Sequence, residues 1–403
     1  MIRIGVLTFH SSINNGAVIQ CYSLVKRLQQ EFPDSAVEVI DYRMPSIEKT
    51  YEVSIKAFLN GYSFCTKLKR LVVLIKNPRL LAWRKERKQA FEKVINLLPL
   101  SEKKILDGDQ KELFDFINIR YNIIVVGSDA IWNYTSRGFP NPYFLSEDVK
   151  IPKFSYAASC YGMDYEKIPE KQKEIIKNVL NQYSLLGIRD EESEKFIEYV
   201  GGSQNYFHTC DPTVFLNVSD LPVNESKLKC KLQKKGYSFD KKTIGVMGND
   251  ALVKMIKAMY GKQYQIVALY NYSKYADVNL HDISPFEWAF IFQYFILTFT
   301  TFFHGTLLSM RNGTPVICIA LETAYAEKHK TKVFDFLERV GLEDCYFHTD
   351  YKSLEIEKIK KKSDELIERM PREKIIAMMN KEAETANKFF KILKKKLKET
   401  ERE

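Results

Sequence analysis

Short apolar segments rich in β-branched and aromatic residues alternate with amphipathic segments along most of this chain. The apolar segments are 2–9, 37–43, 121–126, 153–159, 184–188, 242–248, 264–270, 294–302 and 315–320. Such runs favour buried strands, while several longer segments between them have the three-to-four-residue apolar spacing of amphipathic helices. Strands that are joined through helices pair in parallel, so the sequence predicts an α/β fold built on parallel sheets.

The length of 403 residues favours two domains over one, and the alternating pattern weakens into Pro, Asn and Ser between 208 and 226. We expect an N-terminal α/β domain at 1–215, with a basic helical insertion at 53–104, and a C-terminal α/β domain at 216–370. A basic amphipathic helix is expected at 371–403. Its apolar stripe is Ile375, Met378, Met379, Ala383, Ala386, Phe389, Phe390, Leu393 and Leu397. The predicted architecture is two doubly wound domains that face a cleft.

Composition excludes several classes of protein. Hydrophobic residues make up 45% of the chain and charged residues 28%, and no uncharged apolar run reaches the roughly 18 residues of a membrane span. The first residues, "MIRIGVLTF", resemble a strand more than a signal peptide. Seven cysteines without a CxxC pair predict neither disulfides nor a metal site. We therefore expect a cytoplasmic globular protein without a metal ion.

Most of the net charge of +10 lies in one segment. Residues 61–104 contain twelve Lys or Arg and three Asp or Glu, a net charge of +9. No nucleic-acid-binding motif accompanies them, so we expect no nucleic-acid partner. Three explanations stay open: a helical pair whose charges face solvent, a basic amphipathic surface for the inner leaflet of a membrane, or attraction of an anionic glycan.

Polar residues follow three predicted strands of the N-terminal half. Asn15 and Gly16 come after the first strand and can open a helix with free N–H groups, Ser128 and Asp129 follow a second strand, and Arg189 follows a third. The carboxyl ends of parallel strands lie at one edge of a sheet, where open α/β folds bind ligands. Together these residues predict a site for a small anion. Taken singly, Asp129 can cap a helix near Ile131, and Arg189 can form a surface ion pair.

His304 occupies the corresponding place in the C-terminal half, between an apolar strand and a short helix that Gly305 or Thr306 can begin. A helix amino-terminus favours anions, and an imidazole can carry a proton near neutral pH. The alternative is a packed structural histidine. The sequence lacks the GxGxxG, GxxxxGK[ST] and HExxH motifs.

Seven motifs together resemble the polysaccharide pyruvyl transferase family: "NNGAVIQCYSL", "YNIIVVGSDAIWN", "FSYAAS", "GIRDEES", "CDPTVFL", "SPFEW" and "FFHGTLLSMRNGTPVI". The resemblance implies two Rossmann-like domains in a GT-B-like arrangement. It also implies transfer of a pyruvyl unit from phosphoenolpyruvate to sugar hydroxyls as a ketal in surface-polysaccharide synthesis. Many members carry Asp-Ser or an arginine before the FHG triplet, where this chain has Thr301 and Phe302.

The resemblance further implies a donor site formed by Asp129, Arg189, Phe303 and His304. His304 would transfer a proton, Arg189 would hold phosphate or carboxylate, and Asp129 would orient or deprotonate an acceptor hydroxyl. The N–H groups at Gly305 and Thr306 would add donors. No cofactor is implied beyond phosphoenolpyruvate as donor substrate, and the acceptor is a saccharide, lipid-linked in many members. Two alternatives are a GT-B-like glycosyltransferase that uses a nucleotide-sugar and a non-catalytic relative that binds an anion.

Overall fold

The computed structural model describes residues 1–44, 53–59, 63–76, 80–106, 110–134, 141–202, 205–320, 330–348 and 355–400. Two sheets organise these residues, and every pair of neighbouring strands in them is parallel. The fold class expected from the alternating pattern is therefore confirmed.

The first sheet has the strand order β3-β2-β1-β4-β5-β6-β7. Its strands are β1 (Arg3–Leu7), β2 (Ala36–Arg43), β3 (Leu100–Leu106), β4 (Ile123–Val126), β5 (Lys153–Ala158), β6 (Tyr183–Ile188) and β7 (Tyr206–His208). Strand β4 consists of four apolar residues that are all buried, as expected for a central parallel strand covered on both faces. The edge strand β3 instead exposes much of its polar sequence.

The second sheet has the order β10-β9-β8-β11-β12-β13. Its strands are β8 (Thr243–Met247), β9 (Gln265–Ala268), β10 (Val278–Asn279), β11 (Leu297–Thr300), β12 (Val316–Ala320) and β13 (Tyr346–His348). The predicted domain boundary at 215/216 falls between the last strand of the first sheet and the first strand of the second, and it stays a prediction.

Helices cover both faces of the first sheet. They are α1 (Asn15–Glu31), α5 (Leu80–Ile95) and α17 (Asn387–Thr400) on one face, and α6 (Gln110–Arg120), α8 (Glu170–Asn181) and α9 (Glu191–Val200) on the other. The second sheet is accompanied by α10 (Glu225–Lys234), α11 (Asp250–Tyr260), α12 (Pro285–Ile291), α13 (Phe303–Arg311), α14 (Lys332–Arg339), α15 (Ile356–Arg369) and α16 (Arg372–Glu384). Short 3-10 turns lie at Pro142–Phe144, Tyr165–Lys167, Pro212–Phe215, Val218–Asp220, Phe292–Tyr294 and Glu343–Cys345.

The predicted capping box of α12 is present. The backbone N–H of Glu287 donates to Ser284 Oγ at 3.3 Å, and the Glu287 carboxylate accepts from the backbone N–H of Ser284 at 2.8 Å. Pro285 occupies the first helical position, where its missing N–H costs no hydrogen bond.

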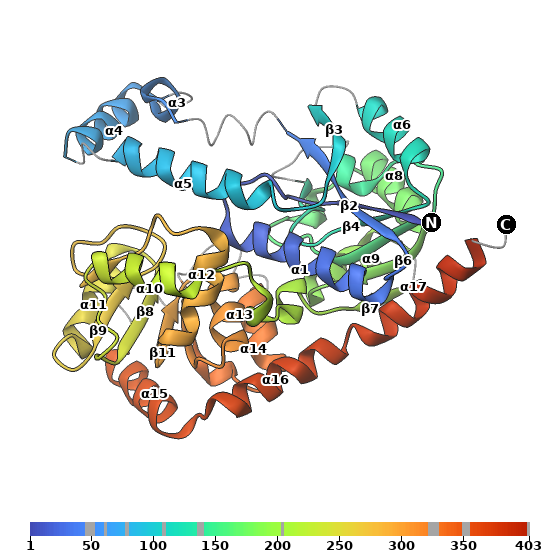
Figure 1. Ribbon diagram of the computed structural model, residues 1–403. Helices are drawn as coiled ribbons and strands as arrows, with labels where there is room; N and C mark the ends of the chain where they lie inside the picture. The colour runs from blue at the N-terminus through green and yellow to red at the C-terminus, as the bar shows by residue number, and fades with distance from the viewer. Residues whose placement is uncertain are drawn as a thin grey trace.

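One apolar core runs from the first sheet through α1 into the second sheet. Tyr22 of α1 packs edge-on against Phe286 of α12, with ring centroids 4.9 Å apart. Figure 1 shows α1 between the two sheets. Because α1 contributes side chains to the cores of both halves, the two halves pack against each other at this helix.

The C-terminal segment returns from the second sheet to the first (Figure 1). The single helix expected at 371–403 is two helices, α16 and α17, separated at Thr385 and Ala386, where the Thr385 hydroxyl donates to the Glu382 carbonyl at 2.7 Å. The rings of Phe389 and Phe390 lie 5.2 and 5.4 Å from that of Tyr156 on β5. The predicted apolar stripe therefore joins the two halves.

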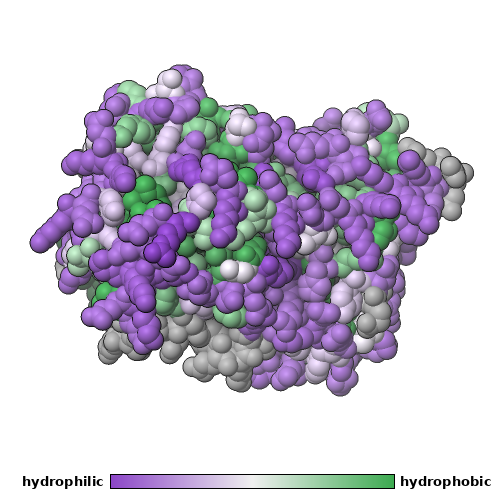
Figure 2. Space-filling view, turned by 90° about the horizontal axis from the view of Figure 1, so that it is seen from below, coloured by the Kyte–Doolittle hydropathy of each residue, from purple (hydrophilic) through white to green (hydrophobic). Residues whose placement is uncertain are grey.

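The predicted insertion, 53–104, contains three helices in its described part: α3 (Ile55–Leu59), α4 (Phe64–Lys76) and α5. Its last residues, 100–104, instead belong to strand β3 of the first sheet, so the expected helical end at 104 is wrong. Trp83 of α5 stacks on Tyr272 of the second half at 5.1 Å, and Phe91 is buried in the core. None of the helices in the described ranges combines the length and hydropathy needed to cross a membrane. The face of the molecule in Figure 2 is mainly hydrophilic, with hydrophobic residues in separate patches.

Candidate active site

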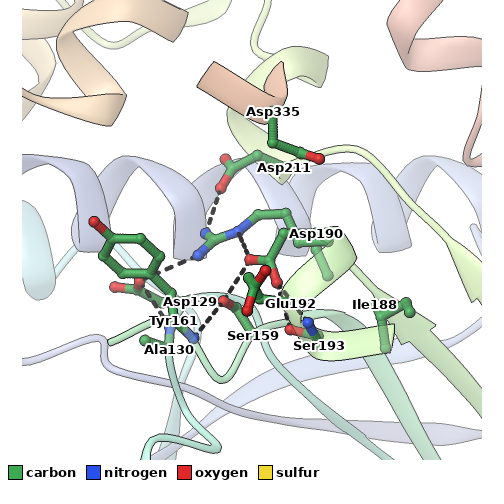
Figure 3. Close-up of polar contacts among 12 residues, drawn as sticks. Asp129, Ala130, Ser159, Tyr161, Ile188, Asp190, Glu192, Ser193, Asp211 and Asp335 are labelled. Carbon is green, nitrogen blue, oxygen red and sulfur yellow. Dashed lines mark hydrogen bonds and ion pairs between the residues drawn. The ribbon is translucent and has the colours of Figure 1, made fainter. Parts of the chain in front are cut away.

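The residues predicted to follow the strands of the first sheet meet residues of the second half at one place. Asp129 follows β4, Arg189 follows β6, and His304 lies in the first turn of α13, directly after β11. Figure 3 shows Asp129, Asp190 and Asp211 arriving at this place from three separate segments. Asp129 and Arg189 lie close together because parallel strands end at the same edge of the first sheet. His304 reaches them because the second half packs against the first.

Arg189 is the buried centre of the cluster, with a side chain 1% exposed. Its Nη1 donates to Asp211 Oδ2 at 3.1 Å, while Nη2 lies 3.8 Å from Asp129 Oδ1 and Nε lies 3.7 Å from Asp190 Oδ2. Neither Nε nor Nη2 has a hydrogen-bond acceptor among the described residues. Buried N–H groups without partners are costly, so these two favour an oxyanion ligand.

Asp211 connects Arg189 to His304. Its Oδ2 also accepts from Gln20 Nε2 at 2.6 Å and lies 3.7 Å from His304 Nε2. Burial raises the pKa of this carboxyl, but its interaction with His304 and the charge of Arg189 outweigh that effect and hold the pKa well below the usual range. Asp211 is therefore an ionised carboxylate that faces the Arg189 guanidinium and the His304 imidazole.

Asp190 supports the cluster instead of facing a ligand. It caps α9 by accepting from the backbone N–H of Ser193 at 3.1 Å, and it also accepts from the hydroxyls of Ser159 and Ser193, each at 2.5 Å. Figure 3 shows both serines beside it. With its oxygens occupied in this way, Asp190 fixes the start of α9 and the position of the neighbouring Arg189.

Asp129 has a left-handed backbone, with φ of 86°, and its Oδ1 accepts from the N–H of Ala130 at 2.8 Å. Burial raises its pKa, but the charges of Lys332, Arg189 and His304 prevail and lower it. Residues 130–132 form a bend and turn, and the nearest helical residue after them is Tyr134, so Asp129 lies too far before it to be its cap and that alternative is wrong. Asp129 is thus an ionised group of the site itself.

Lys332 is a cation of the site that the sequence analysis missed. It begins α14, and its ammonium lies 5.2 Å from the ring centroid of Phe303 and 5.1 Å from that of Tyr161. The Arg189 guanidinium lies 5.1 Å from the same Phe303 ring. Phe303 therefore holds one cation from each half of the molecule beside its ring. Burial lowers the pKa of Lys332, and the charge of Asp129 opposes that shift.

The start of α13 differs from the prediction. The helix begins at Phe303, so its first N–H groups are those of Phe303, His304 and Gly305, and the Thr306 N–H already donates to the Phe302 carbonyl at 3.1 Å. The Thr306 hydroxyl is likewise engaged with the Phe302 carbonyl at 3.2 Å. The expectation that Thr306 donates to a ligand is wrong, because its N–H and its hydroxyl both donate to the Phe302 carbonyl. Gly305 has no room for a Cβ beside the Thr300 hydroxyl, which lets α13 approach β11 closely.

The remaining predicted site residues lie nearby or support others. The Gly16 N–H donates to Asn14 Oδ1 at 3.0 Å. The expectation of a free N–H group at Gly16 is therefore wrong. Asn15 Oδ1 and Ser128 Oγ are buried and have no hydrogen-bond partner among the described residues. Phe302 is one of the two residues that differ from the usual family sequence before the FHG triplet, and its ring centroid lies 4.8 Å from that of Tyr270.

Among the described residues, no group of three His, Cys, Asp or Glu side chains is placed to hold a metal ion.

Gly16 contributes space for the imidazole. A Cβ at this position would lie 2.8 Å from Cε1 of His304 and closer still to Nδ1. Gly16→Ala is expected to keep the fold, because alanine favours a helix, but to displace His304 and lower turnover by about 10²-fold. Steady-state kinetics and thermal unfolding test this. In a His304→Ala background the same substitution should add almost nothing, and an equal loss there would show that Gly16 acts elsewhere.

The comparisons with known proteins agree with this fold. The model of the polysaccharide pyruvyl transferase family matches residues 14–323. None of the curated proteins matches the chain. UDP-GlcNAc 2-epimerase from Neisseria meningitidis, bound to UDP-GlcNAc, superimposes with a TM-score of 0.50 and 13% identity, over 98% of this chain and 100% of that one.

Two further solved structures have the same architecture. UDP-GlcNAc 2-epimerase from Methanocaldococcus jannaschii has a TM-score of 0.51 and 11% identity, over 92% of each chain. UGT89C1 from Arabidopsis thaliana, complexed with UDP, has a TM-score of 0.50 and 10% identity, over 99% of this chain and 100% of that one. At such identities these likenesses establish a GT-B-like fold and nothing about substrates. The family match spans well over half of the sequence, and the chain belongs to the polysaccharide pyruvyl transferase family.

Proposed function

We propose that this protein transfers a pyruvyl unit from phosphoenolpyruvate to two hydroxyls of a saccharide and releases phosphate. The observation that carries the proposal is that Arg189 and Lys332, one cation from each half, both lie beside the ring of Phe303. That ring is next to the imidazole of His304. Phosphoenolpyruvate carries a phosphate and a carboxylate on the same carbon. A site with two separate cations and a proton carrier matches that charge distribution.

The proposed reaction starts with protonation of the donor. His304 gives a proton to the methylene carbon, which becomes a methyl group and leaves positive charge on the neighbouring carbon. A first acceptor hydroxyl adds to that carbon and loses its proton to Asp129 or His304. The carbon–oxygen bond to phosphate then breaks, and a second hydroxyl attacks and loses its proton. The two hydroxyl groups release two protons. One replaces the proton that His304 gave to the methylene carbon, and the other leaves with phosphate.

The chain's own groups support each step. Arg189 offers two N–H groups without acceptors to an oxyanion, and the first N–H groups of α13 point from a helix amino-terminus. The ionised carboxylate of Asp211 lies 3.7 Å from His304 Nε2, beside the group proposed to carry the proton. Asp129, ionised and partly exposed, is the carboxylate available to an acceptor hydroxyl.

Calorimetric titration of phosphoenolpyruvate into the purified protein tests the proposal, with UDP and GDP as control ligands. We expect phosphoenolpyruvate to bind and the nucleotides not to bind. Saccharide acceptors are then screened for phosphate release that depends on both substrates. Binding of UDP or GDP without phosphoenolpyruvate would favour the nucleotide-sugar alternative. Binding of phosphoenolpyruvate without turnover on any acceptor would favour the non-catalytic alternative.

Lys332→Ala is expected to weaken phosphoenolpyruvate binding by about 10- to 100-fold, the usual value of one charge-assisted contact to an anion. Lys332→Arg should recover part of the affinity because it keeps the charge. Lys274→Ala is the matched control, since the Lys274 ammonium also lies beside an aromatic ring, 5.2 Å from the centroid of Tyr275, but belongs to the segment between β9 and β10. Equal affinity of the Lys332→Ala variant and the control would remove Lys332 from the donor site.

A further inference from the structure

Helix α4 leaves an apolar face uncovered. Phe64, Leu68, Leu71, Val72 and Ile75 are all exposed, Phe64 by 75% and Ile75 by 78%. Their spacing places them on one side of a helix, since residues three, four, seven, eight and eleven apart share a face. Exposed apolar residues occur singly elsewhere on proteins, but a continuous helical stripe of this kind marks a contact surface.

The opposite side of α4 is already used for packing. The Arg70 Nε donates to the Phe58 carbonyl at 2.7 Å, and its guanidinium lies 4.0 Å from the centroid of the buried Phe58 ring. Arg84 of α5 lies 5.3 Å from the same ring. These contacts set the rotation of α4, so its apolar stripe points away from α3 and α5. Figure 1 shows α4 at the end of the insertion, away from both sheets.

The charge of α4 identifies the kind of surface that it fits. Lys67 and Lys69 flank the apolar stripe, and the helix sequence FCTKLKRLVVLIK contains no Asp or Glu. A second copy of the chain would bring these like charges together, which opposes self-association through this face. An anionic lipid surface satisfies both features, because lysines contact the headgroups while the apolar side chains enter the boundary of the acyl chains.

We propose that α4 docks this protein on an anionic lipid surface, lying parallel to it with the stripe of Phe64, Leu68, Leu71, Val72 and Ile75 inserted. The thirteen residues of α4 are too few to span a bilayer, so the helix rests in the interface. The proposal does not depend on the transfer reaction, because vesicle binding needs neither donor nor acceptor. Docking at this end of the molecule leaves the junction of the two sheets free.

Co-sedimentation of the full chain with vesicles tests the proposal. Vesicles of phosphatidylcholine with phosphatidylglycerol are compared with vesicles of phosphatidylcholine alone. We expect binding to the anionic vesicles that weakens as salt rises. Leu68→Asp with Ile75→Asp should lower the partition coefficient by about tenfold or more, because both residues would carry charge into the interface. Leu106→Asp with Ile119→Asp, at residues 58% and 87% exposed outside α4, is the matched control and should bind like the wild type.

A second variant tests the electrostatic part. Lys67→Glu with Lys69→Glu keeps the apolar stripe and should reduce binding to the anionic vesicles by about tenfold or more, with a smaller dependence on salt. Absence of wild-type binding to anionic vesicles at low salt would overturn the proposal, as would equal binding by the α4 variant and its control. Light scattering that finds a wild-type dimer, dissociated by Leu68→Asp with Ile75→Asp, would assign the face to a second copy instead.

Discussion

Replacing His304 with alanine is expected to lower the turnover of pyruvyl transfer by about 10²–10⁴-fold while the affinity for phosphoenolpyruvate changes little. The reason is the position of the imidazole. Its Nε2 is buried, has no hydrogen-bond partner among the described residues, and lies 3.7 Å from the ionised Asp211. This arrangement leaves the ring free to carry a proton to a bound molecule. Phosphate release at saturating donor and acceptor measures the effect.

Two variants separate proton transfer from packing. His304→Gln keeps hydrogen-bonding capacity without a titratable nitrogen, and we expect it to be as slow as His304→Ala. His208→Ala is the matched control, because His208 also pairs with a carboxylate, Glu194 at 2.9 Å, but lies on the exposed end of β7. It should turn over like the wild type. Full activity of His304→Ala would make His304 the packed structural residue that the sequence left open.

Replacing Arg189 with alanine is expected to lower the free energy of unfolding by about 3–5 kcal/mol and to abolish phosphoenolpyruvate binding. The guanidinium is buried and donates to Asp211, so its removal leaves an ionised carboxylate without its nearest cation. The same removal eliminates the two N–H groups that lack acceptors. Urea denaturation gives the stability, and calorimetry on the folded variant gives the affinity.

A neutral pair distinguishes the two roles of Arg189. Arg189→Gln with Asp211→Asn removes both charges, and it should recover part of the stability but none of the donor affinity. Arg120→Ala is the control for an ion-paired arginine, since Arg120 contacts Glu38 at 2.9 Å in a partly exposed place. Its loss should lower the free energy of unfolding far less than the loss of Arg189 does. Wild-type stability in Arg189→Ala would mean that another cation compensates the charge of Asp211, and Lys332, which interacts electrostatically with Asp211, is a candidate.

The central strands could be predicted from the sequence, and several edge strands could not. The four residues of β4 are apolar and all buried, so their composition alone indicates a strand covered on both faces. The edge strand β3 has the sequence LSEKKIL and exposes its charged residues, and β7 and β10 have three and two residues. Pairing with a neighbour, which short-range patterns do not encode, makes these segments strands.

The site was predictable in part for a similar reason. Asp129, Arg189 and His304 follow apolar strands directly, so the position of each could be inferred from its own neighbours. Asp211 lies in a stretch rich in turns that resembles a linker, although it belongs to a motif shared with the family. Lys332 lies in a polar segment with no strand immediately before it. Nothing in the local sequence of Asp211 indicates that it contacts Arg189, and nothing around Lys332 indicates that it lies beside Phe303.

The sequence by itself determined the α/β class, the parallel sheets, the helix signals and the family, because each depends on residues that are near one another in the chain. Only the tertiary structure decided that Lys332 and Arg189 share the ring of Phe303, that Gly16 makes room for His304, and that the stripe of α4 stays uncovered. These relations join residues far apart in the chain or on separate helices. They depend on how the two halves and the insertion pack, and that packing is set by the whole core.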